Sequence, residues 1–237
     1  MEYLRHIPLE NIQNCRDLGG YPIKGGGATK FGRLLRCGVP KNPTQSDMDF
    51  IHEYGIKTVF DLRGNLEAQH MPTALSKDPS IEYHQLSLLE INPANPKVGM
   101  TMPEAYLLSI TECGQNIAKL FSLLAKVKGP ALFHCFLGKD RTGITAALIL
   151  YLNDVYFDDI IADYRISATY LEPFYRHEIE IDSGLIWEDN KDNLDSKPEY
   201  IMTVFDYIEK HFGSVQNYLL SLGVTQAEID AVSRLLI

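Results

Sequence analysis

The chain has 237 residues, of which 45% are hydrophobic and 22% charged, and its formal net charge is −9. This composition is typical of soluble globular proteins. The length suffices for one α/β domain with a sizeable core, so we expect a single domain over residues 1–237. The acidic balance argues against a general nucleic-acid-binding protein, which would carry a basic patch.

The N-terminal stretch lacks the apolar core that a secretory signal needs, and the longest apolar run, ITAALILYL, is too short to span a membrane. We therefore expect a cytoplasmic protein without an integral membrane segment, unless a leader has been removed. The four cysteines show no C-x-x-C spacing and the seven histidines form no H-x-x-x-H pair. Neither a zinc site nor a disulfide framework is indicated, so no metal and no cofactor is expected.

In the N-terminal half, apolar runs alternate with helical patterns. Residues 19–38 are rich in glycine and predict a β-hairpin whose turn is the KGGGAT stretch. The stretch TQSDMDFIHEYG has helical spacing and ends in a glycine. The runs 56–64 and 81–89 predict strands, and the proline-containing stretch 90–103 predicts a loop.

A helical pattern covers 104–127, and ALFHCF (131–136) is a strong candidate for a buried strand, before a helix expected over 141–153. Further helices are expected at 158–172, 198–212, 214–222 and 225–236, the last with a capping box from Thr225 to Glu228. Strands that alternate with helices pair in parallel. The expected fold is α/β, with a mostly parallel central sheet flanked by helices, an N-terminal hairpin and a helical C-terminal third.

Cys135 lies between a strand candidate and a helix candidate, at the edge where open parallel sheets bind ligands. The unpaired N–H groups of a helix N-terminus stabilise both a thiolate and a bound phosphate. Arg141, at the start of the expected helix, supplies a planar fork that can hold two phosphate oxygens. One turn of loop can therefore place a sulfur nucleophile beneath a tetrahedral anion while the guanidinium stabilises the developing charge.

Other residues of this loop suit the same chemistry. Gly138 allows a close approach of the backbone, and Thr142 could donate a hydrogen bond to the thiolate. The loop is not a Walker motif, which would need glycine at Phe133 and Ser or Thr at Asp140. A buried structural cysteine is the ordinary alternative. The Gly, Lys, Asp, Arg, Thr and Gly residues from 138 to 143 favour a reactive cysteine.

The stretch HCFLGKDRTG resembles the active-site signature of the cysteine-dependent phosphatases, specifically of a bacterial and fungal tyrosine-phosphatase-like family with the form HCxxGKDRTG. Five more segments resemble that family: NCRDLGG (14–20), RLLRCG (33–38), VFDLRGNLE (59–67), DYRISATYL (163–171) and FGSVQNYLLSLGVTQAEIDAVSRLL (212–236). The resemblance covers nearly the whole chain. Cys15 and Cys37 depart from the family pattern at less constrained positions.

The resemblance implies that Cys135 is the nucleophile of a phosphocysteine mechanism without metal, and that Arg141 clamps the phosphate. It implies that backbone amides of the loop bind the other oxygens, from Phe136, Leu137, Gly138 and Lys139 through Arg141. His134 is expected to order the loop by hydrogen bonding, with a plain core histidine as the alternative.

The leaving group needs a proton from a nearby carboxylic acid. The resemblance implicates Asp140, inside the loop. Asp61, at the end of a neighbouring strand, is the rival, and its alternative role is to pair with an arginine. The stretch WED (187–189) is expected to be a solvated turn rather than a mobile acid loop, because it follows the cysteine loop in sequence.

The family is known for acting on both phosphotyrosine and phosphoinositides, so we expect a phosphorylated protein or a phosphoinositide as substrate, with phosphotyrosine first. Lys139 adds a second cation to the loop, and Arg16 and Arg63, if nearby, would suit substrates with several phosphates. Either arginine could instead pair locally, Arg63 with Glu67, or Arg16 with Asp17 or Asp61.

The resemblance also implies a lid, for which the stretches 90–103 and 172–197 are candidates. Two other functions fit parts of the pattern. A rhodanese-like sulfurtransferase also uses a cysteine in an anion-binding loop, but its loop is shorter and does not require the Arg-Thr-Gly ending. A non-catalytic phosphate-binding module would usually have lost the cysteine, the arginine or the aspartate, and here all three are present.

Overall fold

The structure is a computed structural model, and it describes residues 4–89, 100–177, 180, 186, 188 and 194–237. Its centre is a five-stranded sheet in the order β1-β2-β5-β3-β4. The strands are β1 (Arg16–Asp17), β2 (Leu34–Cys37), β3 (Thr58–Asp61), β4 (Glu82–Gln85) and β5 (Ala131–His134). Strands β2, β5, β3 and β4 run parallel, and β1 is antiparallel to β2, which confirms the expected mostly parallel sheet.

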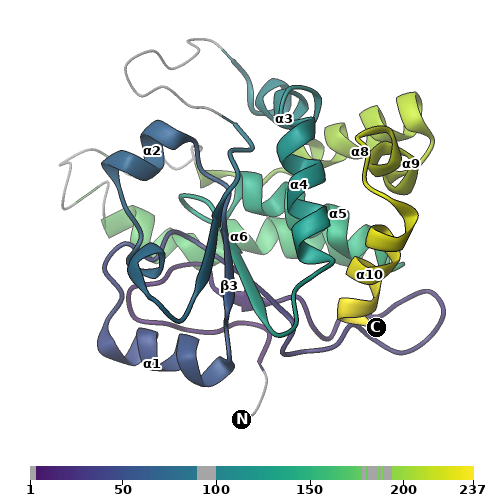
Figure 1. Cartoon of the computed structure of the whole chain (residues 1–237). Coiled ribbons are helices and arrows are strands. Elements are labelled where there is room, and N and C mark those ends of the chain that lie inside the picture. Colours follow the sequence, from purple (N-terminus) through teal and green to yellow (C-terminus); the bar gives the residue numbers. More distant parts are fainter. Residues whose placement is uncertain (1–3, 90–99, 178–179, 181–185, 187, 189–193) are drawn as a thin grey trace.

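Helices surround this sheet (Figure 1). They are α1 (Gln45–Tyr54), α2 (Asn65–His70), the 3-10 helix η1 (Ala74–Lys77), α3 (Met102–Thr111), α4 (Gly114–Leu124), α5 (Asp140–Leu152), α6 (Phe157–His177), α8 (Pro198–Phe212), α9 (Val215–Ser221) and α10 (Gln226–Leu236). Successive strand residues point to opposite faces, so Leu34 and Phe133 join the large core under α3 to α10. Leu35 and Leu132 join a smaller core with Ile51 of α1.

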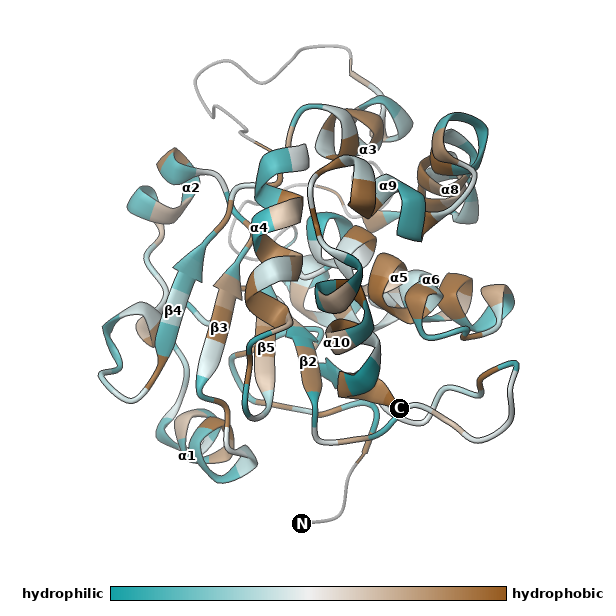
Figure 2. Ribbon diagram, turned by 45° about the vertical axis from the view of Figure 1, so that its right-hand side comes forward, coloured by the Kyte–Doolittle hydropathy of each residue, from teal (hydrophilic) through white to brown (hydrophobic). Residues whose placement is uncertain are grey.

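Helix α5 is the interior helix of the fold. Every residue from Arg141 to Leu150 is buried. A helix that is enclosed on all sides belongs in the interior of a domain, and α5 packs against β2, β5, α6 and α8. Figure 2 shows it surrounded by other helices beside the sheet. This packing fixes the N-terminus of α5 next to the carboxyl end of β5.

The N-terminal hairpin is present, but its bounds differ from those expected. The antiparallel partner of β2 is Arg16–Asp17, which precedes the predicted range. The glycine stretch forms a smaller turn inside the connection, where Ile23 N–H donates to Gly27 O at 3.2 Å and Pro22 bridges Ala28. The glycine-rich stretch predicted this inner turn but not the pairing of β1 with β2.

Two helical predictions also differ in their bounds. The pattern over 104–127 forms two helices, α3 and α4, separated at Glu112 and Cys113. Gly114 begins the second helix, and a Cβ there would lie 2.7 Å from the side chain of Leu222. Helix α6 continues one turn beyond Pro173, and Tyr175 in that turn packs against a small apolar cluster. The C-terminal helices and the capping box at Thr225 match the expectation.

Much of the first lid candidate and half of the second lie outside the described residues. These are 90–99 of the first stretch and most of 178–193 of the second, including two of the three residues of the WED turn. Residues 172–177 belong to α6 rather than to a loop. Across the described ranges, no helix has both the length and the apolar character needed to cross a membrane.

Candidate active site

Cys135 follows the last residue of β5, and α5 begins five residues later at Asp140. We call the intervening segment with the first helical turn, 135–142, the catalytic loop. Its strand lies between β2 and β3, so the loop sits at the carboxyl edge of the parallel strands, as predicted. The Cys135 side chain is buried, with 2% of the residue exposed.

The carbonyl groups of the catalytic loop are turned outward and hydrogen-bonded. Phe136 O accepts from Val39 N–H at 2.8 Å, and the Asn14 amide donates to the carbonyls of Leu137 and Gly138 at 3.0 Å each. Because the peptide group is planar and trans, the N–H that follows each carbonyl points to the opposite side. Amides arranged in this way beside the first turn of a helix are the kind of group that binds anions.

Gly138 is required for this turn. Its φ is +68°, in the left-handed region that glycine favours. A Cβ at this position would lie 2.3 Å from the carbonyl carbon and oxygen of Cys37 at the end of β2. The loop can therefore rest on the neighbouring strand only without a side chain here.

Behind the loop, one buried carboxylate holds two arginines. Asp163 of α6 accepts from Arg16 Nε at 2.8 Å, from Arg36, and from the Tyr21 hydroxyl at 2.9 Å. Arg36 Nη2 donates in turn to Gly138 O at 2.8 Å. Burial would raise the pKa of Asp163, but Arg16 and Arg36 hold it well below its usual range. The ion cluster therefore anchors the loop from behind.

Arg16 belongs to this cluster and not to the pocket. It is fully buried and also donates to Ser167 Oγ at 2.8 Å and to Asn14 Oδ1 at 2.5 Å. The local pairs expected with Asp17 or Asp61 are wrong, because Asp163, from the other half of the chain, takes its charge. Arg16 thus orients the Asn14 amide that holds the loop.

Arg141 is oriented by Glu67 of α2. Its two terminal nitrogens donate to the two carboxylate oxygens at 2.6 and 3.0 Å. Burial lowers the pKa of Arg141, but its interactions with Cys135 and with the Glu67 carboxylate raise it above its usual value, so the guanidinium stays charged. The sequence indicated Glu67 only as a partner for Arg63, and that pairing is wrong, because Glu67 pairs with Arg141.

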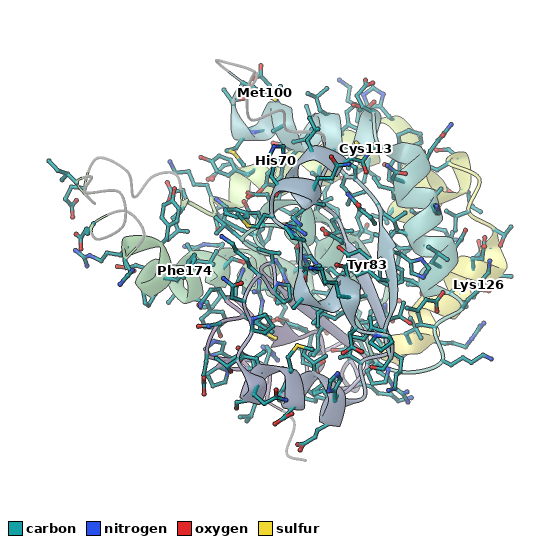
Figure 3. All side chains as sticks on the ribbon, turned by 60° about the vertical axis from the view of Figure 1, so that its left-hand side comes forward. His70, Tyr83, Met100, Cys113, Lys126 and Phe174 are labelled. Carbon is teal, nitrogen blue, oxygen red and sulfur yellow. The ribbon has the colours of Figure 1, made fainter. Side chains whose placement is uncertain are left out.

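Asp61 and Arg63 pair with each other and are both fully buried. Arg63 donates to Asp61 through Nη2 at 2.6 Å and Nε at 2.9 Å, and the Tyr83 hydroxyl also donates to Asp61 at 2.5 Å. Tyr83 belongs to β4 and is labelled in Figure 3. Arg63 also donates to Met71 O at 2.7 Å, just beyond α2. The pair therefore secures the helix that carries Glu67, and neither side chain is exposed to a substrate.

Two further predicted residues, His134 and Thr142, lie at the two ends of the catalytic loop. His134 is fully buried, with Nδ1 3.1 Å from Cys135 O and 3.8 Å from Asp61 Oδ1, and burial lowers its pKa. A neutral imidazole in this position supports an ordering role. Thr142 is also buried, and its hydroxyl has no hydrogen-bond partner among the described residues. Its bond to the thiolate stays a prediction.

Asp140 has a different environment from Asp61. Its side chain is 29% exposed, and Oδ1 accepts from the Tyr106 hydroxyl of α3 at 2.5 Å. Lys139 lies beside it, with Nζ 3.6 Å from Asp140 Oδ1 and 3.0 Å from Asp195 O. Tyr106 was not singled out in the sequence, because a tyrosine at helical spacing indicates only a core position.

A cavity of about 330 Å³ adjoins the catalytic loop. Its apolar wall consists of Val39, Met71, Phe136, Leu137 and Phe174, and the other lining residues are Asn11, Gln13, Gly38, Lys41 and Asn42. Phe174 lies near the end of α6 (Figure 3). Within the residues that the structure describes, no three His, Cys, Asp or Glu side chains are grouped to hold a metal ion.

A model of the tyrosine phosphatase family matches residues 7–237. The chain belongs to the tyrosine phosphatase family. It is 30% identical to a tyrosine-protein phosphatase of Nostoc commune over 200 residues, which are 79% of this chain and 68% of the relative. A putative tyrosine-protein phosphatase of Cupriavidus necator is 28% identical over 91% of this chain and 83% of its own length.

A third relative is the triple specificity protein phosphatase PtpB of Mycobacterium tuberculosis, which is 29% identical over 50% of this chain and 48% of its own length. The chain is therefore a phosphatase, a hydrolase of the cysteine-dependent type. This agrees with the resemblance carried by the HCFLGKDRTG stretch.

The Asp61–Arg63 pair predicts a pH dependence of stability. Burial alone would raise the pKa of Asp61, but His134, Arg63 and the Tyr83 hydroxyl lower it to about 2, against an ordinary 3.8. Asp61 thus contributes stability above pH 4 that is lost as the pH falls toward 2. The advantage of wild type over Asp61→Asn in unfolding free energy should shrink by about 1 kcal/mol between about pH 6 and pH 3 in urea titrations. A difference independent of pH would contradict the charged pair.

Proposed function

We propose that this phosphatase hydrolyses phosphotyrosine in proteins through a phosphocysteine intermediate, with Cys135 as the nucleophile. The observation that carries the proposal is the catalytic loop. Asn14 and Arg36 donate to its carbonyls, and this supports a loop whose amides point to the opposite side, toward an anion held beside the cysteine. Arg141 belongs to the same loop, and Glu67 fixes the orientation of its guanidinium.

In the first step the Cys135 thiolate attacks phosphorus, and the bond from phosphorus to the phenolic oxygen breaks. The loop amides and Arg141 stabilise the charge on the three equatorial oxygens. Asp140 gives its proton to the leaving oxygen, so that tyrosine leaves as a neutral phenol.

In the second step water attacks the phosphocysteine and the bond from sulfur to phosphorus breaks. Asp140, now a carboxylate, takes a proton from the attacking water, and inorganic phosphate is released. The Thr142 hydroxyl, a buried donor without a partner among the described residues, would stabilise the departing thiolate.

The environments of the two carboxylates support Asp140 as the acid. Asp61 is fully buried and paired with Arg63, and its pKa of about 2 leaves no proton to donate near neutral pH. Asp140 lies in the loop itself and is partly exposed. Proton transfer requires contact with the bridging oxygen, and the place of Asp140 one residue before Arg141 supports such a contact.

The contacts of the basic residues favour a single phosphate on an organic group over a polyphosphate. Arg16 and Arg63 donate to buried carboxylates, so the expected additional cations are not exposed in the pocket. The adjoining cavity has an apolar wall that suits an aromatic ring. The alternative is a phosphoinositide, and it rests on Lys139 within the loop and on the triple specificity named for one relative.

Wild-type rates on three substrates test the substrate class, and the Cys135→Ser variant tests the phosphocysteine intermediate. We expect wild type to hydrolyse a phosphotyrosine peptide faster than a phosphoserine peptide or phosphatidylinositol phosphates. We expect Cys135→Ser to lose turnover on all of them while still binding the phosphotyrosine peptide in calorimetry. Turnover by the serine variant would overturn the mechanism, and a faster rate on the lipids would replace the substrate.

Asp140→Asn tests the acid. We expect its kcat to fall about 100-fold on phenyl phosphate, because the poor leaving group needs the proton. The loss on p-nitrophenyl phosphate should be much smaller, since p-nitrophenolate leaves without one. Asp61→Asn is the matched control, and its rates should fall by one factor for both substrates. The reverse pattern in the two variants would assign the acid to Asp61.

A further inference from the structure

Asp140 is connected to two buried tyrosine hydroxyls that come from outside the catalytic loop. The Tyr106 hydroxyl of α3 lies 2.5 Å from Asp140 Oδ1, and 2.6 Å from the hydroxyl of Tyr164 of α6. Tyr106 is 1% exposed and Tyr164 is fully buried. A carboxylate at the start of α5 is therefore tied to two other helices of the core.

The direction of these hydrogen bonds follows from the number of protons. An ionised carboxylate only accepts, so Tyr106 must spend its one hydroxyl proton on Asp140. Tyr106 then accepts from Tyr164, which donates. Burial, reinforced by the charge of Asp140, raises the pKa of both tyrosines well above the usual value, so both hydroxyls keep their protons.

This chain of donors distinguishes the two oxygens of the carboxyl group. Oδ1 receives the Tyr106 hydroxyl and lies 3.6 Å from Lys139 Nζ. Oδ2 is then the oxygen that can carry a transferable proton. A fixed Oδ1 also stops rotation of the carboxyl group, and proton transfer depends on such orientation. Tyr200 packs edge-on against the Tyr106 ring, with centroids 6.3 Å apart, and holds that ring in place.

We propose that Tyr106 is a positioning residue for the general acid, which holds Asp140 Oδ1 so that the proton on Oδ2 points at the leaving oxygen. This inference rests on the proposed function. In the first step the proton passes from Oδ2 to the phenolic oxygen, and in the second step Oδ2 regains one from water. The Tyr106 proton stays on its oxygen throughout, and Tyr164 supports Tyr106 from behind.

Leaving-group dependence tests the proposal, because a merely structural defect would slow all substrates by one factor. We expect Tyr106→Phe to lower kcat on phenyl phosphate about tenfold more than on p-nitrophenyl phosphate, with KM nearly unchanged. Tyr164→Phe should show a smaller selective loss in the same direction, because the direct bond to Asp140 remains.

Tyr218→Phe is the matched control. It also removes a buried hydroxyl bond, to Ile110 O at 2.7 Å, but it does not touch Asp140. We expect it to lower stability without changing the ratio of the two rates. In the Asp140→Asn background, Tyr106→Phe should have no further selective effect, since the two residues act as one unit.

Equal losses on both substrates in Tyr106→Phe, or a selective loss that persists in the Asp140→Asn background, would overturn the positioning role. Those results would leave the proposed function intact if Asp140→Asn alone is selective and Cys135→Ser is inactive. Turnover by Cys135→Ser would instead overturn the proposed function and this inference with it.

Discussion

The hydrogen bonds that Asn14 and Arg36 donate to the carbonyls of Leu137 and Gly138 are the constraint on which the site depends. Because the N–H of a peptide group points away from its carbonyl, these bonds support the proposal that the loop amides face the phosphate of the substrate. The two donors are in turn fixed by Arg16 and Asp163. A buried ion cluster of this kind is costly to form and is strongly destabilising when one partner is lost, so the loop is held rigidly.

Some charged residues of the site form buried structural pairs, and others remain accessible from the surface. Asp61 and Arg63 secure the segment around α2, which brings Glu67 to Arg141. Under the proposed function, this arrangement orients Arg141 before a substrate binds, and preorganised donors are the main source of stabilisation for a phosphoryl transition state. Asp140 is the carboxylate of the loop that stays partly exposed. The difference in burial therefore fits a structural role for the Asp61–Arg63 pair and the proposed acid role for Asp140.

The sequence predicted the features that depend on neighbouring residues. The strand, loop and α5 follow one another within 22 residues, and their apolar and polar pattern predicted where the loop with Cys135 and Arg141 lies in the fold. Long-range contacts carried no such signal. Arg16 meets Asp163 across 147 positions, and Tyr106 meets Asp140 across 34. For Arg16 the sequence indicated the wrong carboxylates, and for Tyr106 it indicated no partner. Periodicity predicts which side of an element is buried, but it does not predict which residue packs against that side.

A crystal structure with orthovanadate bound to the wild-type protein tests the central claim, that outward carbonyls leave the loop amides directed at one oxyanion. We predict vanadium above Cys135 Sγ, with its equatorial oxygens about 2.7–3.2 Å from the amides of the catalytic loop and from the Arg141 guanidinium. The Gly138 carbonyl should still accept from Asn14 and Arg36. Vanadate bound away from Cys135, or a loop carbonyl turned toward it, would contradict the account.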